Sequence, residues 1–306
     1  MWRKFFDEKH SLIHQYLISR NAESVAEFLR DPASNSLFHG FDPISLVGTN
    51  TFKDNEIQRK GYAARVYDSL RRLCEAIGAI DLEYPEQYPI SGTKIVAVDS
   101  LLEALDKSFG FRVDFPNPFP QEYGLATPRG IVGHRTTHAL YQAWKIRELT
   151  SKIARPSVVE IGAGLGRTAY YSYRLGITDY TIVDLPITNV SQAYFLGVTL
   201  GRNRVALHGE DRDRGDVAII PPEAFQLSSS RIDLVLNSDS LTEMSESFAN
   251  SYFSIAAKRS QMLLSINHEF NRIKIRNLMA ACADVHNYSR YPYWMRRGYV
   301  EELVTF

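Results

Sequence analysis

The stretch that decides the fold reads Val158-Val159-Glu160-Ile161-Gly162-Ala163-Gly164-Leu165-Gly166-Arg167-Thr168. A short apolar run, typical of a buried strand, leads through an acidic residue and three alternate glycines into a segment with helical character. Glycine has no Cβ, so the backbone can turn tightly and approach a ligand, and the following helix begins with free amides. The stretch therefore predicts a strand-to-helix turn with a ligand against its main chain. A tight turn without a ligand is the alternative.

The spacing of the glycines discriminates between ligands. Dinucleotide sites read G-x-G-x-x-G and place a pyrophosphate at the helix start, whereas here the third glycine comes one residue earlier. The pattern resembles the first motif of class I methyltransferases, whose cofactor is S-adenosyl-L-methionine (SAM). The resemblance implies that SAM is bound by Glu160, Gly162, Ala163, Gly164 and Gly166. Glu160 either contacts the methionine end of the cofactor or holds the loop.

A second anchor follows the next predicted strand, in Ile182-Val183-Asp184-Leu185-Pro186. A carboxylate at the carboxyl end of a strand can accept hydrogen bonds from both hydroxyls of a ribose, so we expect Asp184 and Leu185 to contact the nucleoside. Because dinucleotide and SAM sites both use an acid there, Asp184 does not choose between them. The alternative is an N-cap for a helix with Pro186 at an early position.

Strand and helix signals alternate from Ser157 onward and predict a Rossmann-like α/β domain over 133–306, with a mostly parallel sheet flanked by helices. The predicted strands cover 158–159, 180–183, 205–207, 232–236, 262–266 and 301–306, and the predicted helices 136–150, 187–200, 245–257 and 271–281. Residues 1–132 are predicted to be a helical N-terminal region, divided by a turn-rich stretch from Asp31 to Pro43. Three prolines make 111–120 an irregular lid or linker.

The composition of the chain limits the classes of binding partner that we expect. Thirty-five basic and thirty-five acidic side chains cancel, so no global field attracts nucleic acid or an anionic membrane. Cys74 and Cys282 lie far apart, which argues against a disulfide framework or a zinc cluster. We find neither a secretory signal nor the roughly 20 apolar residues of a membrane span. A cytoplasmic protein is expected, and a homo-oligomer through the N-terminal helices stays open.

The fourth predicted strand runs into a polar loop, where we look for catalysis. Ligands of open parallel sheets bind at the carboxyl ends of the strands, so Asn237 and Ser238 are predicted to line the cofactor site. Methyl transfer to a hydroxyl is helped by a base that removes the hydroxyl proton. The candidate bases are Glu243 in this loop, His268 after the fifth strand and His134 at a helix entry, histidine being attractive because its ordinary pKa is near neutrality.

Two other features have simpler interpretations. Residues 209–216 contain enough carboxylates for a hard cation, but the interleaved arginines favour a solvated charged loop. Glu210 or Asp211 could still border the adenine pocket. His138 is interpreted as a residue on a helix face that contacts nothing. We assign no metal ligands.

Several segments together resemble the sugar O-methyltransferase family, bacterial proteins often associated with surface-polysaccharide pathways. They are 111–120, 133–135, 159–166, 184–186 and 237–244. The resemblance implies a SAM-dependent O-methyltransferase that methylates a hydroxyl of a sugar or glycan. Three alternatives remain: a methyltransferase with a small natural product or another non-sugar acceptor, a non-catalytic binding or scaffold protein, and a nicotinamide oxidoreductase, which the glycine spacing disfavours.

Overall fold

The computed structural model describes residues 11–35, 37–38, 44, 46–82, 95–120, 122–213, 215–280 and 282–306. Several positions of the predicted turn-rich stretch, including Ser36, Gly40, Asp42 and Pro43, lie outside the described residues, as do residues 1–10. The backbone contacts divide the chain into two compact units, 1–138 and 139–306, and the division falls within one helix. Each unit is described by itself.

Unit 1, residues 1–138, is mainly helical in its described part, as the sequence predicts. Its elements are α2 (Ser11–Ile18), α3 (Ala22–Arg30), the 3-10 helix η1 (Pro32–Ser34), α4 (Leu46–Phe52), α5 (Glu56–Ala76), α6 (Val98–Phe109), β1 (Leu125–Thr127), β2 (Gly130–Val132) and the start of α7 (His134–Leu149). Strands β1 and β2 form an antiparallel hairpin. The sequence analysis did not predict this hairpin, because each strand has only three residues and periodicity needs longer segments.

The core of unit 1 follows from the apolar spacing of its two longest helices. Leu70 and Leu73 of α5 and Leu101 and Leu105 of α6 are completely buried. The proline-rich segment 111–120 contains no helix or strand, as predicted, and its backbone amide at Val113 donates to Asp106 Oδ1 at 2.8 Å. A carboxylate on α6 thus holds the irregular segment against the helical layer.

Unit 2, residues 139–306, contains the Rossmann-like domain that the sequence predicts. Its eight-stranded sheet has the order β5-β6-β4-β3-β7-β8-β10-β9. The strands are β3 (Val158–Ile161), β4 (Tyr180–Val183), β5 (Val205–Leu207), β6 (Val217–Ile220), β7 (Ile232–Ser238), β8 (Ser260–His268), β9 (Asn287–Pro292) and β10 (Tyr299–Thr305). The pairs from β5 through β8 are parallel, and β10 pairs antiparallel with both β8 and β9.

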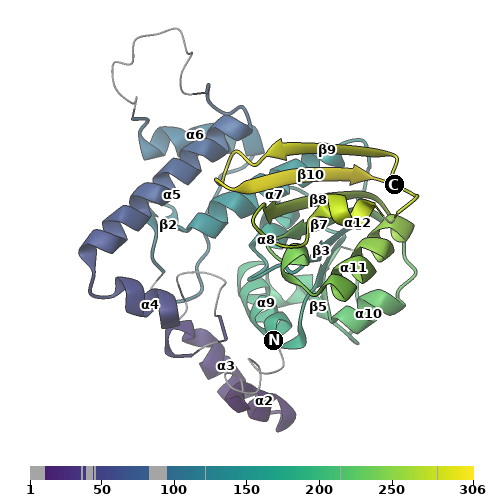
Figure 1. Ribbon diagram of the computed structural model, residues 1–306. Helices are drawn as coiled ribbons and strands as arrows, with labels where there is room; N and C mark the ends of the chain where they lie inside the picture. The colour runs from purple at the N-terminus through teal and green to yellow at the C-terminus, as the bar shows by residue number, and fades with distance from the viewer. Residues whose placement is uncertain are drawn as a thin grey trace. The chain divides into compact units, whose positions relative to one another are not determined.

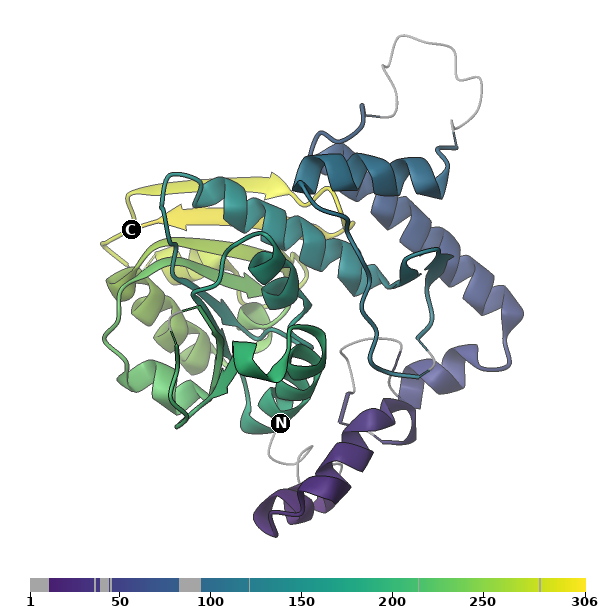
Figure 2. The same ribbon diagram turned by 180° about the vertical axis from the view of Figure 1, so that it is seen from behind.

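Helices cover both faces of this sheet. They are the remainder of α7, then α8 (Arg167–Arg174), α9 (Pro186–Thr199), α10 (Pro222–Leu227), α11 (Glu246–Arg259) and α12 (Ile275–Met279), with the 3-10 turns η2 (Arg202–Arg204) and η3 (Leu241–Glu243). Figure 1 shows α10, α11 and α12 on one face, and Figure 2 shows the teal helices on the other. Tyr252 and Phe253 of α11 pack in one buried cluster with Val159 and Val235 of the sheet.

The structure contains two strands that the sequence analysis did not predict, and it changes the position of a third. Residues 217–220 form β6, which lies between β4 and the edge strand β5, so the predicted third strand at 205–207 is the sheet edge. Residues 287–292 form β9, the opposite edge. The predicted helix at 271–281 is shorter and covers 275–279. None of the helices in the described ranges combines the length and apolarity that a membrane crossing requires.

Candidate functional site at the carboxyl ends of the parallel strands

The glycine turn lies where the order of the strands in the sheet reverses. The chain pairs β3 with β4 on one side and with β7 on the other, and ligands of open α/β sheets bind at such a switch point. Gly162, Gly164 and Gly166 all have left-handed backbones, with φ of +76°, +55° and +90°. Side chains rarely adopt this conformation, which explains why glycine occupies all three positions.

The space around the three glycines differs. A Cβ on Gly162 would lie 2.3 Å from Ser240 Oγ, and one on Gly166 would lie 3.2 Å from Leu196 Cδ1, so these glycines permit close packing inside the protein. A Cβ on Gly164 would meet no heavy atom within 4 Å. The middle glycine therefore faces open space, and it is the one whose backbone a ligand could approach.

Asp184 is bound directly to the glycine turn. Its Oδ2 accepts hydrogen bonds from the Ala163 amide at 3.0 Å and from Gln192 Nε2 at 2.8 Å, and its Oδ1 accepts one from the Leu185 amide at 2.8 Å. Burial raises the pKa of Asp184 to about 6, although these hydrogen bonds oppose the shift. The structure thus brings together the two segments that the sequence analysis singled out.

Gln192 is a residue that sequence analysis missed. It lies in α9, completely buried, and its Nε2 also donates to the Gly164 carbonyl at 2.9 Å. One amide group therefore bridges Asp184 and the glycine turn. The only local signal was a polar residue on the sheet-facing side of a helix, which does not reveal its partners before the fold is known.

Glu160 lies beneath the turn and is 3% exposed. Its carboxylate accepts a hydrogen bond from Tyr180 Oη at 2.9 Å. Burial raises the pKa of Glu160 to about 7, and the nearby Asp184 carboxylate adds to the increase. This hydrogen bond joins Glu160 to β4, and the two roles that the sequence left open both stay predictions.

Asn237 has a completely buried side chain whose polar atoms all bind protein groups. Its Nδ2 donates to the Ile161 carbonyl at 2.9 Å and to Ser240 Oγ, and its Oδ1 accepts from the Leu241 amide and from Asn267 Nδ2. A buried amide satisfied in this way joins the ends of β3, β7 and β8. The Asn237 side chain thus joins the loops, and its contact with the cofactor stays a prediction. Sequence analysis missed Ser240 and Asn267.

Ser238 is partly exposed and is connected to the start of α8 through another missed residue. Gln142 of α7 donates from Nε2 to Ser238 Oγ at 2.9 Å and accepts from Thr168 Oγ1 at 2.6 Å. Because Thr168 follows the glycine turn and Ser238 ends β7, Gln142 links the two loops at the carboxyl edge of the sheet.

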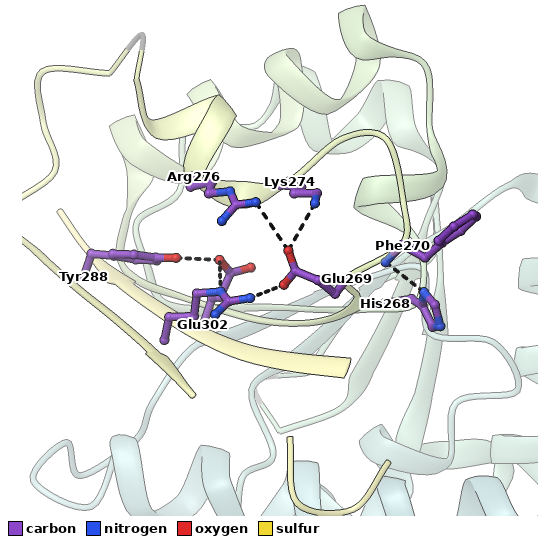
Figure 3. Close-up of polar contacts among 8 residues, drawn as sticks. His268, Glu269, Phe270, Lys274, Arg276, Tyr288 and Glu302 are labelled. Atoms are coloured by element: carbon purple, nitrogen blue, oxygen red, sulfur yellow. Dashed lines mark hydrogen bonds and ion pairs between the residues drawn. The ribbon is translucent and has the colours of Figure 1, made fainter. Parts of the chain in front are cut away.

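Two of the candidate bases lie at the same edge. Glu243 is exposed at the end of η3, just beyond β7. His268 ends β8, is partly exposed, and accepts a hydrogen bond at Nδ1 from the Phe270 amide at 3.0 Å (Figure 3). A neutral imidazole that accepts at Nδ1 carries its proton on Nε2. In this geometry Nε2 of His268 is a donor, and the catalytic role of His268 stays a prediction.

The third candidate base, His134, lies in unit 1 as the first residue of α7. Its Nε2 is 3.3 Å from Nε2 of His138, which is 8% exposed. The interpretation of His138 as a residue that contacts nothing is therefore wrong. The spacing of four residues places both rings on one face of the helix.

A charged network fixes the loop that follows His268. Glu269 pairs with Lys274 at 3.2 Å and with Arg276 at 3.5 Å (Figure 3). It also pairs with Arg290 of β9. Partial burial opposes ionisation of Glu269, but Arg290 and Lys274 outweigh this effect and hold the pKa of Glu269 below its ordinary value. Since its members pair with one another, we interpret the network as structural.

The charged segment 209–216 connects β5 to β6. Arg212 pairs with Asp179 at 2.7 Å and donates to the Asp216 carbonyl, while Glu210 accepts from the Leu207 amide at 2.8 Å. Glu210 and Asp211 line an open groove of about 730 Å³ beside α9 and β5, the edge strand. In the part of the chain that the structure describes, no group of three or more His, Cys, Asp or Glu side chains is arranged to hold a metal ion.

Comparisons with known proteins give remote structural matches. No protein-family model matches the sequence, and no curated protein matches it significantly. The magnesium protoporphyrin IX methyltransferase of Synechocystis PCC 6803, solved with bound SAM, is 11% identical, with 82% of this chain and 96% of that chain covered and a TM-score of 0.41. The glycopeptide N-methyltransferase MtfA, complexed with SAM, is 13% identical (53% and 86% covered, TM-score 0.40). The methyltransferase domain of bacterial-CtHen1-CN is 8% identical (54% and 97% covered, TM-score 0.40).

Proposed function

We propose that unit 2 binds SAM at the glycine turn and transfers its methyl group to a hydroxyl of a sugar or glycan. The observation that carries the cofactor assignment is the open space beside Gly164, next to a carboxylate hydrogen-bonded to the same turn. A ligand with a ribose fits this arrangement, since its hydroxyls would donate to Asp184. No pyrophosphate is needed, in keeping with the glycine spacing.

The cofactor residues divide into two groups in this proposal. Gly162, Ala163, Gly164, Gly166, Asp184, Leu185 and Ser238 form the surface against which SAM lies. Glu160 and Asn237 are buried behind it and hold its shape, together with Gln142 and Gln192. Preorganised groups of this kind fix the donor so that the acceptor oxygen can attack in line.

SAM supplies an electrophilic methyl group, so the protein must orient the acceptor and remove one proton. We assign the base to Glu243, because it is exposed at the carboxyl edge and an ionised carboxylate can accept the hydroxyl proton. His268 would donate its Nε2 proton in a hydrogen bond to an acceptor oxygen. His134, the other base predicted from the sequence, lies in unit 1 and takes no part in this assignment.

One surface feature supports a sugar acceptor. Phe270 is 90% exposed, and its ring centroid is 6.2 Å from that of His268. A sugar ring presents an apolar C–H face that suits an aromatic side chain, while its hydroxyls suit Glu243 and His268. An aromatic ring and two polar groups at one edge of the sheet match this mixed surface.

The test is methyl transfer from isotopically labelled SAM to a panel of monosaccharides, glycans and non-sugar alcohols, followed by mass spectrometry. The proposal predicts labelled methyl on a carbohydrate oxygen, and less of it with Phe270→Ala. Labelled methyl only on a non-sugar acceptor would favour the natural-product alternative. Binding of SAM without transfer to any acceptor would favour a scaffold protein.

A further inference from the structure

The histidine pair at the start of α7 is a feature of unit 1 that the proposed methyl transfer does not use. Nε2 of His134 and Nε2 of His138 are 3.3 Å apart, and the two ring centroids are 4.5 Å apart. The two nitrogens are therefore close enough for one ion to contact both. We propose that the pair chelates one transition-metal ion of the zinc type, with water in the remaining coordination positions.

The distance between the two nitrogens suits a shared metal ion. Zinc–imidazole bonds of about 2.0–2.1 Å at a tetrahedral angle place the two nitrogens about 3.3–3.4 Å apart. The observed distance of 3.3 Å between the two Nε2 atoms agrees with this value. At this distance the two rings also hydrogen-bond to each other, so a bound ion would replace that hydrogen bond.

Contacts with α5 hold the part of the backbone that carries both rings. The His134 amide donates to Tyr62 Oη of α5 at 3.3 Å, and Thr137 Oγ1 lies 2.6 Å from Ser69 Oγ of the same helix. Thr137 Oγ1 also donates to the His134 carbonyl at 2.8 Å. Two contacts to α5 thus fix the first turn of α7, which lowers the entropy lost when the two imidazoles bind one ion.

The chemistry of the donors limits which ion fits. Two neutral imidazoles favour zinc, copper, nickel or cobalt over magnesium or calcium, which require oxygen ligands. His138 is buried, whereas His134 is partly exposed to solvent. With two protein ligands the site leaves positions open, unlike a closed structural zinc site.

Calorimetric titration of the full chain with Zn²⁺ tests this site. We expect saturable binding of one ion that is lost in His134→Gln and in His138→Gln. It should persist in the matched control His286→Gln, which removes an exposed histidine of unit 2. His134→Cys should restore binding, because a thiolate is also a zinc ligand. The side chain of His134 is partly exposed, so its replacement should leave the fold intact.

A second readout uses Co²⁺, whose visible absorption becomes intense when four ligands surround it tetrahedrally. The wild-type chain should develop this band and His134→Gln should not. Identical Zn²⁺ isotherms for wild type and His134→Gln, or a Co²⁺ band in both, would overturn the proposal. Neither outcome bears on SAM binding, since the histidine pair lies in unit 1 and the glycine turn in unit 2.

Discussion

Replacing Gly164 by alanine separates the cost of backbone strain from the loss of a ligand surface. Gly164 has a φ of +55°, and a Cβ there would meet no protein atom within 4 Å. Gly176, between α8 and β4, has a φ of +85° and equally open surroundings. Gly176→Ala is therefore a matched control with the same kind of strain outside the candidate site.

The expected magnitudes follow from this comparison. A left-handed backbone costs a residue with a Cβ roughly 1–2 kcal/mol. Alanine also restricts the unfolded chain more than glycine does, which stabilises the folded state by about 0.4–1 kcal/mol. Each variant should therefore lose about 1 kcal/mol of stability, which lowers the Tm by about 2–4 °C for a domain of this size. Only Gly164→Ala should weaken binding of S-adenosylhomocysteine, by at least about tenfold or 1.4 kcal/mol.

The assay pairs thermal unfolding with calorimetric titration of S-adenosylhomocysteine. Similar Tm shifts with a loss of affinity in Gly164→Ala alone would place the ligand at the turn. Unchanged affinity in Gly164→Ala would refute the reasoning, because a methyl group at this position must enter the space assigned to the cofactor. An equal loss of affinity in both variants would attribute the effect to strain.

Three further predictions concern the carboxylates and His268. Asp184 must be ionised to accept the ribose hydroxyls, so wild-type affinity for S-adenosylhomocysteine should fall as the pH drops below about 6, whereas Asp184→Asn should bind weakly throughout; a calorimetric pH series measures both. Glu160→Gln should raise the free energy of unfolding at pH 8 by on the order of 1–3 kcal/mol, because the raised pKa makes ionisation in the fold costly. The pKa of Glu160 is about 7 in the folded chain, and its ordinary value is 4.5. Urea titrations should therefore show that the stability gained by Glu160→Gln shrinks as the pH falls from 7 to 4.5. An equal gain at pH 8 and at pH 4.5 would contradict this prediction. Glu243→Gln should lower turnover on an identified acceptor by about 10²–10⁴-fold and His268→Ala by less, both with unchanged cofactor affinity; normal turnover in Glu243→Gln would exclude it as the base.

The two segments that we propose bind the cofactor were visible in the sequence, because their signals are local. Three alternate glycines and an acid after the next strand are set by backbone geometry, and the structure joins Ala163 and Asp184 by a hydrogen bond. Gln142 and Gln192 were not visible. Their amides bridge loops that are distant in sequence, and their partners exist only after the sheet has formed.

The missing strands have a similar explanation. Residues 217–220 are a short apolar run directly after a charged loop, and such a run does not by itself distinguish a strand from a loop that packs inward. Residues 287–292 form an edge strand with mostly exposed side chains, so no apolar alternation marks it. Tautomer assignment at His268 also required the structure, since it depends on the Phe270 amide.

The most direct test of the central claim is calorimetric titration of the purified chain with S-adenosylhomocysteine, with NAD as the control ligand. The account predicts saturable binding of S-adenosylhomocysteine and none of NAD, because the glycine turn offers Gly164 and Asp184 to a nucleoside without a pyrophosphate site. Saturable binding of NAD alone would contradict the account. Binding of neither ligand would contradict it as well and would leave the Rossmann-like unit without its proposed cofactor.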